Sequence, residues 1–453
     1  MWPNIEESAR KIITENIEPA IQKELSKDFA FDMVALGETP PAITGITIKD
    51  KNVAQNLIII DIDLMFNSNG DIGFTVNKMK ANVIDLHIEG SLRVVLKPLV
   101  TKIPLVGGVQ VYFPNSPKIT FDLGGDLGNL AKVLRLKEKM FRVIQEKIED
   151  KFVLPNKFTK SLNPEVSQIE LQSLNSSGVL RVHLIKAENL MNKDTKGFSG
   201  KSDPYAKLSV GSMHFTSKII WNDLNPEWKG KNEFKVDFPK EIFGGQELII
   251  ELFDHDHVKD DALGYATIAA STVVHRKQIN KMWVNLENAE TGRVQLSLSW
   301  FEVSNDNEEI KFLKQNGPKM CLLTLFIESC TGLKGSRGLP SPTVLMAIEG
   351  RPVEEKRSTR TKKNTENPIF EQGFTFVVSN PHNDKLNITV LDSSHRDTAL
   401  GKLDIAMFDL LYMTDLGFDS TPKELKDGAG TITLSARLHA LKSPFNFVTQ
   451  LSN

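Results

Sequence analysis

The chain repeats itself with a period of about 140 residues, and this repeat limits the possible folds. Residues 225–228 (NPEW) recur as 367–370 (NPIF), and each copy ends in a strand of alternating apolar residues, at 294–300 and 431–438. Short alternating strands separated by Asn, Asp, Gly and Pro are typical of β-sandwiches. The sequence therefore predicts two copies of one sandwich. The predicted ranges are 178–303 and 318–440 for the sandwiches, 304–317 for a polar linker and 441–453 for a tail.

An acidic loop at 252–264 follows a strand-like run in the first copy. Asp254 and Asp256 point the same way, because residues i and i+2 of an extended chain share a face. Asp260 or Asp261 can approach the same point from the far side of the loop. Converging carboxylates repel one another unless a hard cation lies between them, and Ca²⁺ takes about six to eight oxygen ligands. An ordinary solvated acidic loop is the alternative.

A second acidic loop lies upstream and strengthens the case for a cation. Asp194 and Asp203 bracket a Gly-containing loop that leads into the strand-like run 206–210. A sandwich gathers its loops at its two ends, so loops this far apart in the sequence can meet there. The sequence therefore predicts a Ca²⁺ site in the first sandwich.

The second copy has lost most of these carboxylates. The SDPY segment of the first copy is PSPT in the second, and Ser394 stands where the first copy has Asp256. Asp392 and Asp397 remain. Two carboxylates form a poor Ca²⁺ cage, so we expect the site of the second sandwich to be degenerate.

A basic segment distinguishes the second copy. Such a segment can attract anionic lipid headgroups, at roughly 1 kcal/mol per basic residue near the membrane surface. Glu354 and Glu355 dilute its field, so an ordinary solvated face is the alternative. Its cations are Lys356, Arg357, Arg360, Lys362 and Lys363.

Residues 1–160 differ in kind from the two copies. Residues 4–26 carry apolar positions at helical spacing, alternating strands follow, and a long helix is predicted from about 127 to 152. This order indicates an α+β domain. The apolar stripes of this domain, taken alone, indicate an ordinary hydrophobic core. A groove that binds lipid is the alternative interpretation. The candidate groove residues are Ile58, Ile60, Ile62, Leu64, Ile84, Leu86, Ile88, Leu92, Val94, Ile144 and Ile148.

Composition and missing motifs narrow the function. A net charge of -2 argues against a nucleic-acid-binding protein. The two cysteines, Cys321 and Cys330, allow neither a disulfide framework nor a Cys-based zinc site. Residues 395–397 match the His-Arg-Asp triplet of kinases, but no Gly-rich loop, Asp-Phe-Gly or Gly-x-Ser-x-Gly motif accompanies it. We expect no enzymatic activity. No apolar run is long enough to span a bilayer and no signal peptide is evident, so the chain as given is expected to lack a membrane anchor.

Three segments carry a resemblance to a known family. KSDPYAKLSVG and ELFDHDHVKDDALG, with NPEWKGKNEF between them, resemble a C2 domain, which is a Ca²⁺-dependent membrane-docking sandwich. MWPNI, LVTKIPLVGGVQVYF and DKFVLPNKFTKSL resemble the SMP domain, a TULIP-like lipid-binding tube. An SMP domain followed by C2 domains is similar to the extended synaptotagmins, with the tricalbins and plant synaptotagmins as relatives. The resemblance covers nearly the whole chain.

The resemblance implies a function and assigns residues to it. It implies transfer of glycerophospholipids and tethering at contacts between the endoplasmic reticulum and the plasma membrane, by a homo- or heterodimer joined through the SMP domain. A Ca²⁺-dependent membrane scaffold without lipid transfer is the alternative. Phe198 and Val258 would be apolar tips that enter an anionic membrane, and Val258 stands where relatives often have an acid. A loop residue packed on its own domain is the alternative for Phe198. The implied Ca²⁺ ligands are the Lys193 carbonyl and the carboxylates of Asp194, Asp203, Asp254, Asp256 and Asp260 or Asp261. The chain begins just inside the family's SMP domain, so that domain is expected to be incomplete at its N-terminus.

Overall fold

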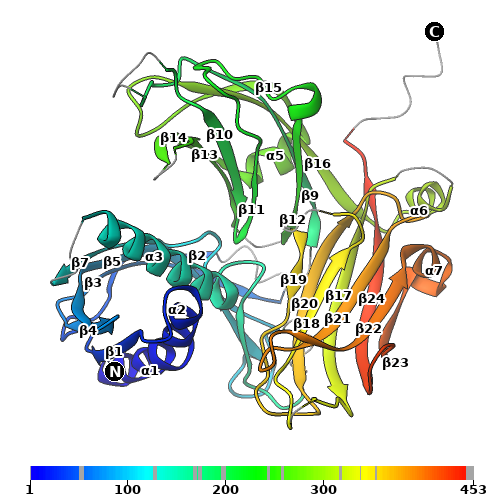
Figure 1. The fold of residues 1–453 in the computed structure, drawn as a ribbon. Helices are drawn as coiled ribbons and strands as arrows, with labels where there is room; N and C mark the ends of the chain where they lie inside the picture. The colour runs from blue at the N-terminus through cyan, green and yellow to red at the C-terminus, as the bar shows by residue number, and fades with distance from the viewer. Residues whose placement is uncertain are drawn as a thin grey trace. The chain divides into compact units, whose positions relative to one another are not determined.

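The computed structural model divides the chain into two compact units, Met1–Leu171 and Gln172–Asn453, shown in Figure 1. An α+β domain followed by two β-sandwiches is confirmed. No helix within the described residues is long and apolar enough to cross a bilayer. The structure describes residues 2–49, 56–125, 130–166, 171, 176–194, 200–241, 245–256, 260–315, 319–336, 338–351 and 355–444.

Helices flank the sheet of the first unit. The predicted helix at 4–26 is present, but it is divided into α1 (Trp2–Ile12), a π-helical turn (Ile13–Ile17) and α2 (Glu18–Glu24). The long helix α3 spans Leu130–Phe152. The π-helical turn, α2 and α3 each place buried side chains in one core with residues of the strands. This core includes Ile17, Ile21, Phe74, Phe121, Met140 and Val143.

The sheet of the first unit is antiparallel throughout. Its main path runs β1-β4-β5-β3-β2, with β6 and β7 also paired to β5, and β8 paired to β6. The long strand β5 therefore organises the unit. The strands are β1 (Ala30–Val34), β2 (Ala42–Lys49), β3 (Ile58–Asn67), β4 (Ile72–Val76), β5 (Met79–Leu96), β6 (Gly108–Tyr112), β7 (Lys118–Gly125) and β8 (Phe158–Ser161).

The first sandwich packs the sheet β11-β10-β13-β14 against β12-β9-β16 and β15. Its buried core includes Trp228 and Trp300, each about 1% exposed. Helix α5 (Ala270–Arg276) closes one part of it. The strands are β9 (Ser176–Glu188), β10 (Pro204–Val210), β11 (Met213–Thr216), β12 (Phe234–Glu241), β13 (Glu247–Asp254), β14 (Asp261–Ala269), β15 (Gln278–Asn285) and β16 (Arg293–Ser304).

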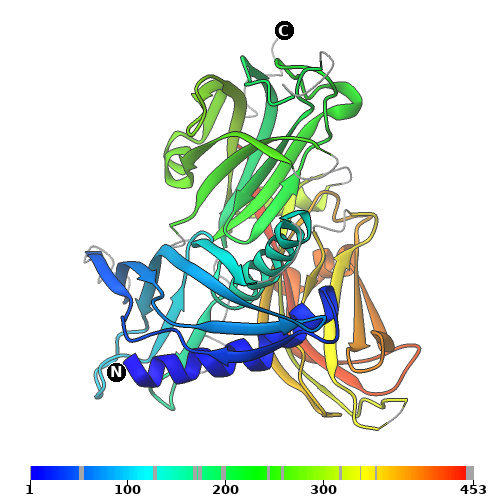
Figure 2. The ribbon, with the colours of Figure 1, turned by 60° about the vertical axis from the view of Figure 1, so that its left-hand side comes forward.

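The second sandwich repeats this arrangement, as the internal repeat predicted, with β19-β18-β21-β22 against β20-β17-β24 and β23. Figure 2 shows both sandwiches from a second side. Helix α7 spans Met407–Tyr412. The strands are β17 (Cys321–Thr331), β18 (Pro342–Ile348), β19 (Arg357–Ser358), β20 (Ile369–Val378), β21 (Lys385–Asp392), β22 (Thr398–Ala406), β23 (Gly417–Glu424) and β24 (Thr431–Lys442).

The two sandwiches share one sheet. The end of β16 pairs antiparallel with the end of β24, through Glu302–Lys442, Val303–Leu441 and Ser304–Ala440. The predicted polar linker contains a helix, α6 (Asn307–Lys314), whose first turn is capped by the Asp306 side chain. The sequence had offered only a linker here, because the helix is short and its single buried residue, Leu313, gives little periodicity.

Candidate functional site

The acidic loops of the first sandwich meet at one end of strands β10 and β13. The two strands pair so that Pro204 lies opposite Asp254. Asp203, directly before β10, therefore lies beside Asp254, and its backbone N–H donates to Asp254 Oδ1 over 2.6 Å. The strand register thus brings together carboxylates that are 51 residues apart in the sequence.

Asp254 has one carboxylate oxygen with no hydrogen-bond partner among the described residues. The residue is fully buried (0% exposed), and its Oδ2 is one of three buried side-chain polar atoms, among the described residues, that lack a hydrogen bond. Buried polar groups nearly always have partners, and a buried acceptor without one carries a desolvation cost. An oxygen ligand for a hard cation fits this atom.

The other predicted ligands surround this oxygen with negative charge. Burial raises the pKa of Asp194, and the neighbouring carboxylates of Asp254, Asp203 and Asp261 raise it further. The pKa of Asp256 is raised in the same way, first by burial and then by Asp254, Asp194, Asp261 and Asp260. The predicted aspartates of both loops therefore contribute to one electrostatic field.

Some of these carboxylates are held by protein donors. Asp203 Oδ1 accepts from the Asn222 backbone N–H (2.6 Å), and Asp260 Oδ2 accepts from the Tyr205 hydroxyl (2.7 Å). As the side chains stand, no group of three or more His, Cys, Asp or Glu residues in the described ranges is arranged to hold a metal ion. His255 lies beside these carboxylates, since its Nδ1 is 3.2 Å from Asp260 Oδ1.

Of three other predicted site residues, the structure describes one. Lys193 lies at the loop, where its backbone N–H donates to Ser202 Oγ over 2.9 Å. Phe198 and Val258 lie outside the described residues.

The second sandwich fills the equivalent position with its own donors. Asp392, also fully buried, accepts on Oδ1 from the backbone N–H groups of Ser341 (2.9 Å) and Ser394 (3.1 Å) and from Ser394 Oγ (2.5 Å). His395 Nδ1 lies 3.0 Å from Asp392 Oδ2. Burial alone would raise the pKa of Asp392, but these hydrogen bonds leave it lowered. This carboxylate is satisfied without a cation.

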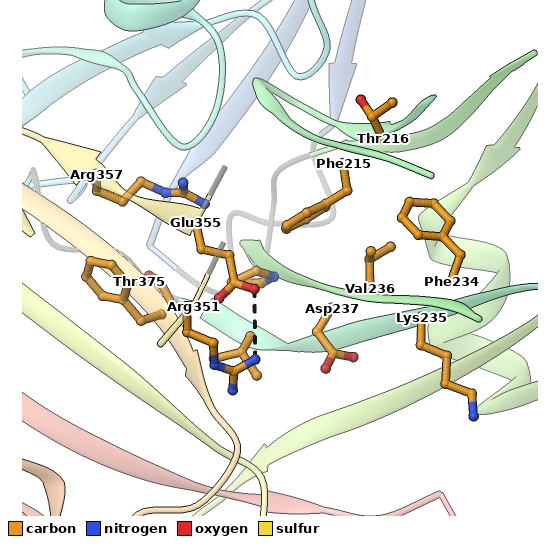
Figure 3. A pocket seen from close by; sticks show the side chains of 13 residues that line it. Phe215, Thr216, Phe234, Lys235, Val236, Asp237, Arg351, Glu355, Arg357 and Thr375 are labelled. Carbon is orange, nitrogen blue, oxygen red and sulfur yellow. Dashed lines mark ion pairs between the residues drawn. The ribbon is translucent and has the colours of Figure 1, made fainter. Parts of the chain in front are cut away.

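The basic segment of the second sandwich does not form one surface. Lys356, Arg360 and Lys363 are exposed and Lys362 is partly exposed. Arg357 instead lines a cavity of about 350 Å³ within the second unit, which also contains the ion pair between Arg351 and Glu355 (3.8 Å; Figure 3). Burial lowers the pKa of Arg357. The sequence did not distinguish Arg357 because its neighbours have the same charge.

An apolar face runs across β2, β3 and β5 of the first unit. Ile46 pairs with Ile62, and Ile62 pairs with Leu92, so these three side chains lie on one face of the sheet. In the next row Ile60 pairs with Val94. Ile46 is 60% exposed. Six of the candidate groove residues on these strands are partly buried, namely Ile58, Ile60, Ile62, Leu64, Leu92 and Val94.

The sequence reasoning missed the edge strand of this face. Ile43, Ile46 and Ile48 of β2 are 58%, 60% and 62% exposed, although they belong to an ordered antiparallel ladder. Their spacing in AITGITIK was a usable signal, but a glycine interrupts the alternation. An apolar row of this length left open to solvent is unusual for a water-soluble surface.

Other candidate groove residues are placed differently. Leu86, Ile88, Ile144 and Ile148 pack against the core between the helices and the sheet. Ile84 is 39% exposed. A separate, largely apolar cavity of about 250 Å³ opens near the start of α3, lined by Leu25, Val76, Met79, Val133 and Leu136 among others.

Family profiles match most of the chain. The Synaptotagmin-like mitochondrial-lipid-binding domain matches residues 1–163, and the C2 domain matches 178–286 and 321–417. The human protein named extended synaptotagmin-2 is 33% identical over 437 residues, which is 92% of this chain and 46% of that protein. Extended synaptotagmin-3 of Xenopus tropicalis is 32% identical over 448 residues, covering 92% and 49%. The chain thus spans about half the length of these relatives.

A solved structure has the same three-domain order. The structure of the SMP domain and the two C2 domains that follow it in extended synaptotagmin-2 superposes with a TM-score of 0.65 at 29% identity, covering 98% of this chain and 97% of that one. The resemblance inferred from the sequence motifs is confirmed.

Proposed function

We propose the function of this chain from its family: it belongs to the extended synaptotagmins. It transfers glycerophospholipids between membranes that it tethers, on the cytosolic side of contacts between the endoplasmic reticulum and the plasma membrane. Ca²⁺ at the first sandwich regulates docking. It works as a homo- or heterodimer through the first unit, and it has no catalytic step.

The observation that carries lipid transfer is the open apolar face on β2, β3 and β5. Each methylene of an acyl chain costs about 0.8 kcal/mol when it is exposed to water. The rows through Ile46, Ile62 and Leu92 offer side chains that are themselves half-buried or exposed. An acyl chain lying on them shields both surfaces at once.

The observation that carries Ca²⁺ regulation is the unpartnered Oδ2 of buried Asp254. The residues that would hold the ion are the Lys193 carbonyl and the carboxylates of Asp194, Asp203, Asp254, Asp256 and Asp260 or Asp261. Bound Ca²⁺ supplies positive charge that inverts the sign of the loop end. The loop end then attracts an anionic membrane, which the aspartates without Ca²⁺ would repel. This change of charge does not require the sandwich to change shape.

Lys356, Arg360, Lys362 and Lys363 of the second sandwich contact anionic headgroups without Ca²⁺, since their exposed or partly exposed side chains belong to one short segment. Arg357 contributes less to this contact because it lines the cavity.

The test compares two variants of neighbouring residues on β3. Ile62→Asp places a charge in the apolar face, whereas Asp63→Asn changes an exposed residue that points the other way. Native mass spectrometry of the full chain should find glycerolipid in the wild type and in Asp63→Asn, and little in Ile62→Asp. Lipid exchange between vesicles should follow the same order.

A wild-type chain that carries no lipid and exchanges none would refute lipid transfer. If it still clustered vesicles in Ca²⁺, a Ca²⁺-dependent scaffold would be the function.

A further inference from the structure

A large apolar side chain stands exposed at the rim of the acidic site. Trp221 is 65% exposed, whereas Trp228 and Trp300 of the same sandwich are buried in its core. The contact recorded for its ring is an edge-to-face arrangement with His255, at 5.8 Å between ring centroids. Most of the indole surface is therefore not covered by the described part of the sandwich and is available to a partner outside it.

The loop that carries Trp221 is fixed to strand β10. The backbone N–H groups of Ser217, Ile220 and Asp223 donate to the carbonyls of Ala206, Pro204 and Ser202, over 2.8, 2.9 and 3.1 Å. The loop therefore runs beside β10 with a hydrogen bond every three residues. Trp221 lies between two of these bonds, so the backbone holds it in place.

The same loop is tied to the acidic site. Asn222 has a positive φ of 55°, and its N–H donates to Asp203 Oδ1 over 2.6 Å. Asn tolerates this left-handed conformation better than most residues. Trp221 therefore projects from a position one residue away from a hydrogen bond to a predicted Ca²⁺ ligand.

The second sandwich contains the same loop. The N–H groups of Thr359, Lys362 and Thr365 donate to the carbonyls of Val344, Pro342 and Pro340, again three residues apart.

The register of the two loops identifies one pair of equivalent residues. Asn364 has a φ of 53° and donates to Ser341 Oγ over 3.2 Å, as Asn222 donates to Asp203. The residue before it, Lys363, is therefore the counterpart of Trp221. Both side chains are exposed. One rigid loop position thus presents an indole in the first sandwich and an ammonium group in the second.

The indole and the ammonium group favour different regions of a phospholipid bilayer. Tryptophan is enriched at the membrane interface, where its ring meets acyl chains and headgroups. Lysine is drawn to anionic headgroups through a field that falls off within about 10 Å at 0.1 M salt. The negative loop end of the first sandwich opposes such an approach until its charge is cancelled, which would make the tryptophan contact depend on Ca²⁺.

We propose that Trp221 is a membrane anchor of the first sandwich, which inserts into the interface of an anionic phospholipid bilayer when Ca²⁺ is bound; Lys363, already assigned to headgroup contact, is its electrostatic counterpart at the equivalent position of the second sandwich. This inference rests on the proposed Ca²⁺-dependent docking and names a residue that performs it.

The test uses the full chain, vesicles of phosphatidylcholine and phosphatidylserine, and three variants. Trp221→Ala should bind vesicles in Ca²⁺ about ten-fold more weakly, because the indole surface is no longer withdrawn from water. The loss should be similar at low and high salt. Lys363→Ala should lose about five-fold at low salt and little at high salt. Trp283→Phe is the matched control, since Trp283 already packs against Arg293 (4.2 Å from guanidinium carbon to ring).

Two further measurements show whether the substitution acts on membrane contact or on Ca²⁺ binding. Calorimetric titration should give the same Ca²⁺ affinity for Trp221→Ala as for the wild type without vesicles. Lipids brominated near the headgroup should quench tryptophan fluorescence in Ca²⁺ for the wild type and Trp283→Phe, and much less for Trp221→Ala.

Two outcomes would overturn the inference in different ways. If the wild type binds vesicles in Ca²⁺ and Trp221→Ala binds equally well and is quenched equally, the anchor is wrong and the docking function stands. If the wild type shows no Ca²⁺-dependent binding, the proposed docking fails and the anchor fails with it.

Discussion

Replacing Asp254 by Asn should stabilise the first sandwich in the absence of Ca²⁺. The wild-type carboxylate is fully buried, and within the described residues its Oδ1 accepts a hydrogen bond from the Asp203 N–H while its Oδ2 accepts none. The Asn side chain can keep that bond through its carbonyl oxygen. Its NH₂ group then replaces Oδ2 and can donate to the neighbouring carboxylates, while one negative charge leaves the cluster.

The expected size follows from the cost of an unpartnered buried acceptor. That cost is about 1–3 kcal/mol, so the free energy of unfolding without Ca²⁺ should rise by a similar amount. The two sandwiches share a sheet, so we expect them to unfold together. For a unit of that size, about 1 kcal/mol shifts Tm by roughly 2 °C. Tm in a chelator should therefore rise by about 2–6 °C, the opposite of the usual result for a core substitution.

The same substitution should remove the response to Ca²⁺. An ion present at about 100 times its Kd stabilises the folded state by roughly 2.7 kcal/mol. Scanning calorimetry of the full chain, with chelator and with excess Ca²⁺, follows the transition that Ca²⁺ shifts. The wild type should show this shift and Asp254→Asn should not.

Asp392→Asn is the matched control in the second sandwich. This carboxylate has donors on both oxygens, including His395 near Oδ2. An amide there removes the acceptor that faces His395, so we expect a loss of about 1–3 kcal/mol. A fall in Tm for Asp254→Asn in chelator, comparable to that of Asp392→Asn, would refute the reasoning.

Three further results are expected. Ca²⁺ affinity, measured by titration across pH, should begin to fall at a higher pH than ordinary aspartates would give, because the raised pKa values of Asp194 and Asp256 let protons compete with the ion. In chelator, the contribution of these two groups to the free energy of unfolding should grow as pH falls through their raised pKa values, because the folded state then binds more protons than the unfolded state. Arg93→Met should destabilise the first unit by about 1–3 kcal/mol in chemical unfolding, because Arg93 is 5% exposed and makes two bonds to Asp61 (2.6 and 2.8 Å), while Asp61 keeps its ion pair with Lys49 (3.0 Å); adding Asp61→Asn should recover part of the loss. Arg360→Gln should weaken Ca²⁺-independent binding to anionic vesicles by roughly 1 kcal/mol at low salt, and an unchanged affinity would exclude the basic segment from headgroup contact.

The fold was predictable because its signals are repeated and periodic. The repeat indicated both sandwiches, and the alternation along 58–66 and 84–96 indicated the central strands of the first unit. The grouping of Asp203 with Asp254 also followed from the sequence, since both flank strands of one sandwich.

The details that the sequence missed depend on cross-strand neighbours. Ile46 and Ile48 were overlooked because Gly45 interrupts the local alternation, and their shared face becomes clear only through their pairing with Ile62 and Ile60. Trp221 follows two isoleucines, and nothing in the local sequence shows that Ile220 packs against the core while Trp221 is exposed. The placement of Arg357 in a cavity likewise depends on residues from another part of the chain.

The short ladder between β16 and β24 has a consequence for modularity. It is accompanied by an apolar cluster of Val179, Leu322, Val377 and Leu441, which are at most 9% exposed. A first sandwich excised at residue 303 would present both an open strand edge and the apolar surface that this cluster covers, a combination that promotes aggregation. The unit that can be exchanged, grafted or inherited intact is therefore the pair of sandwiches, although the sequence repeat divides it in two.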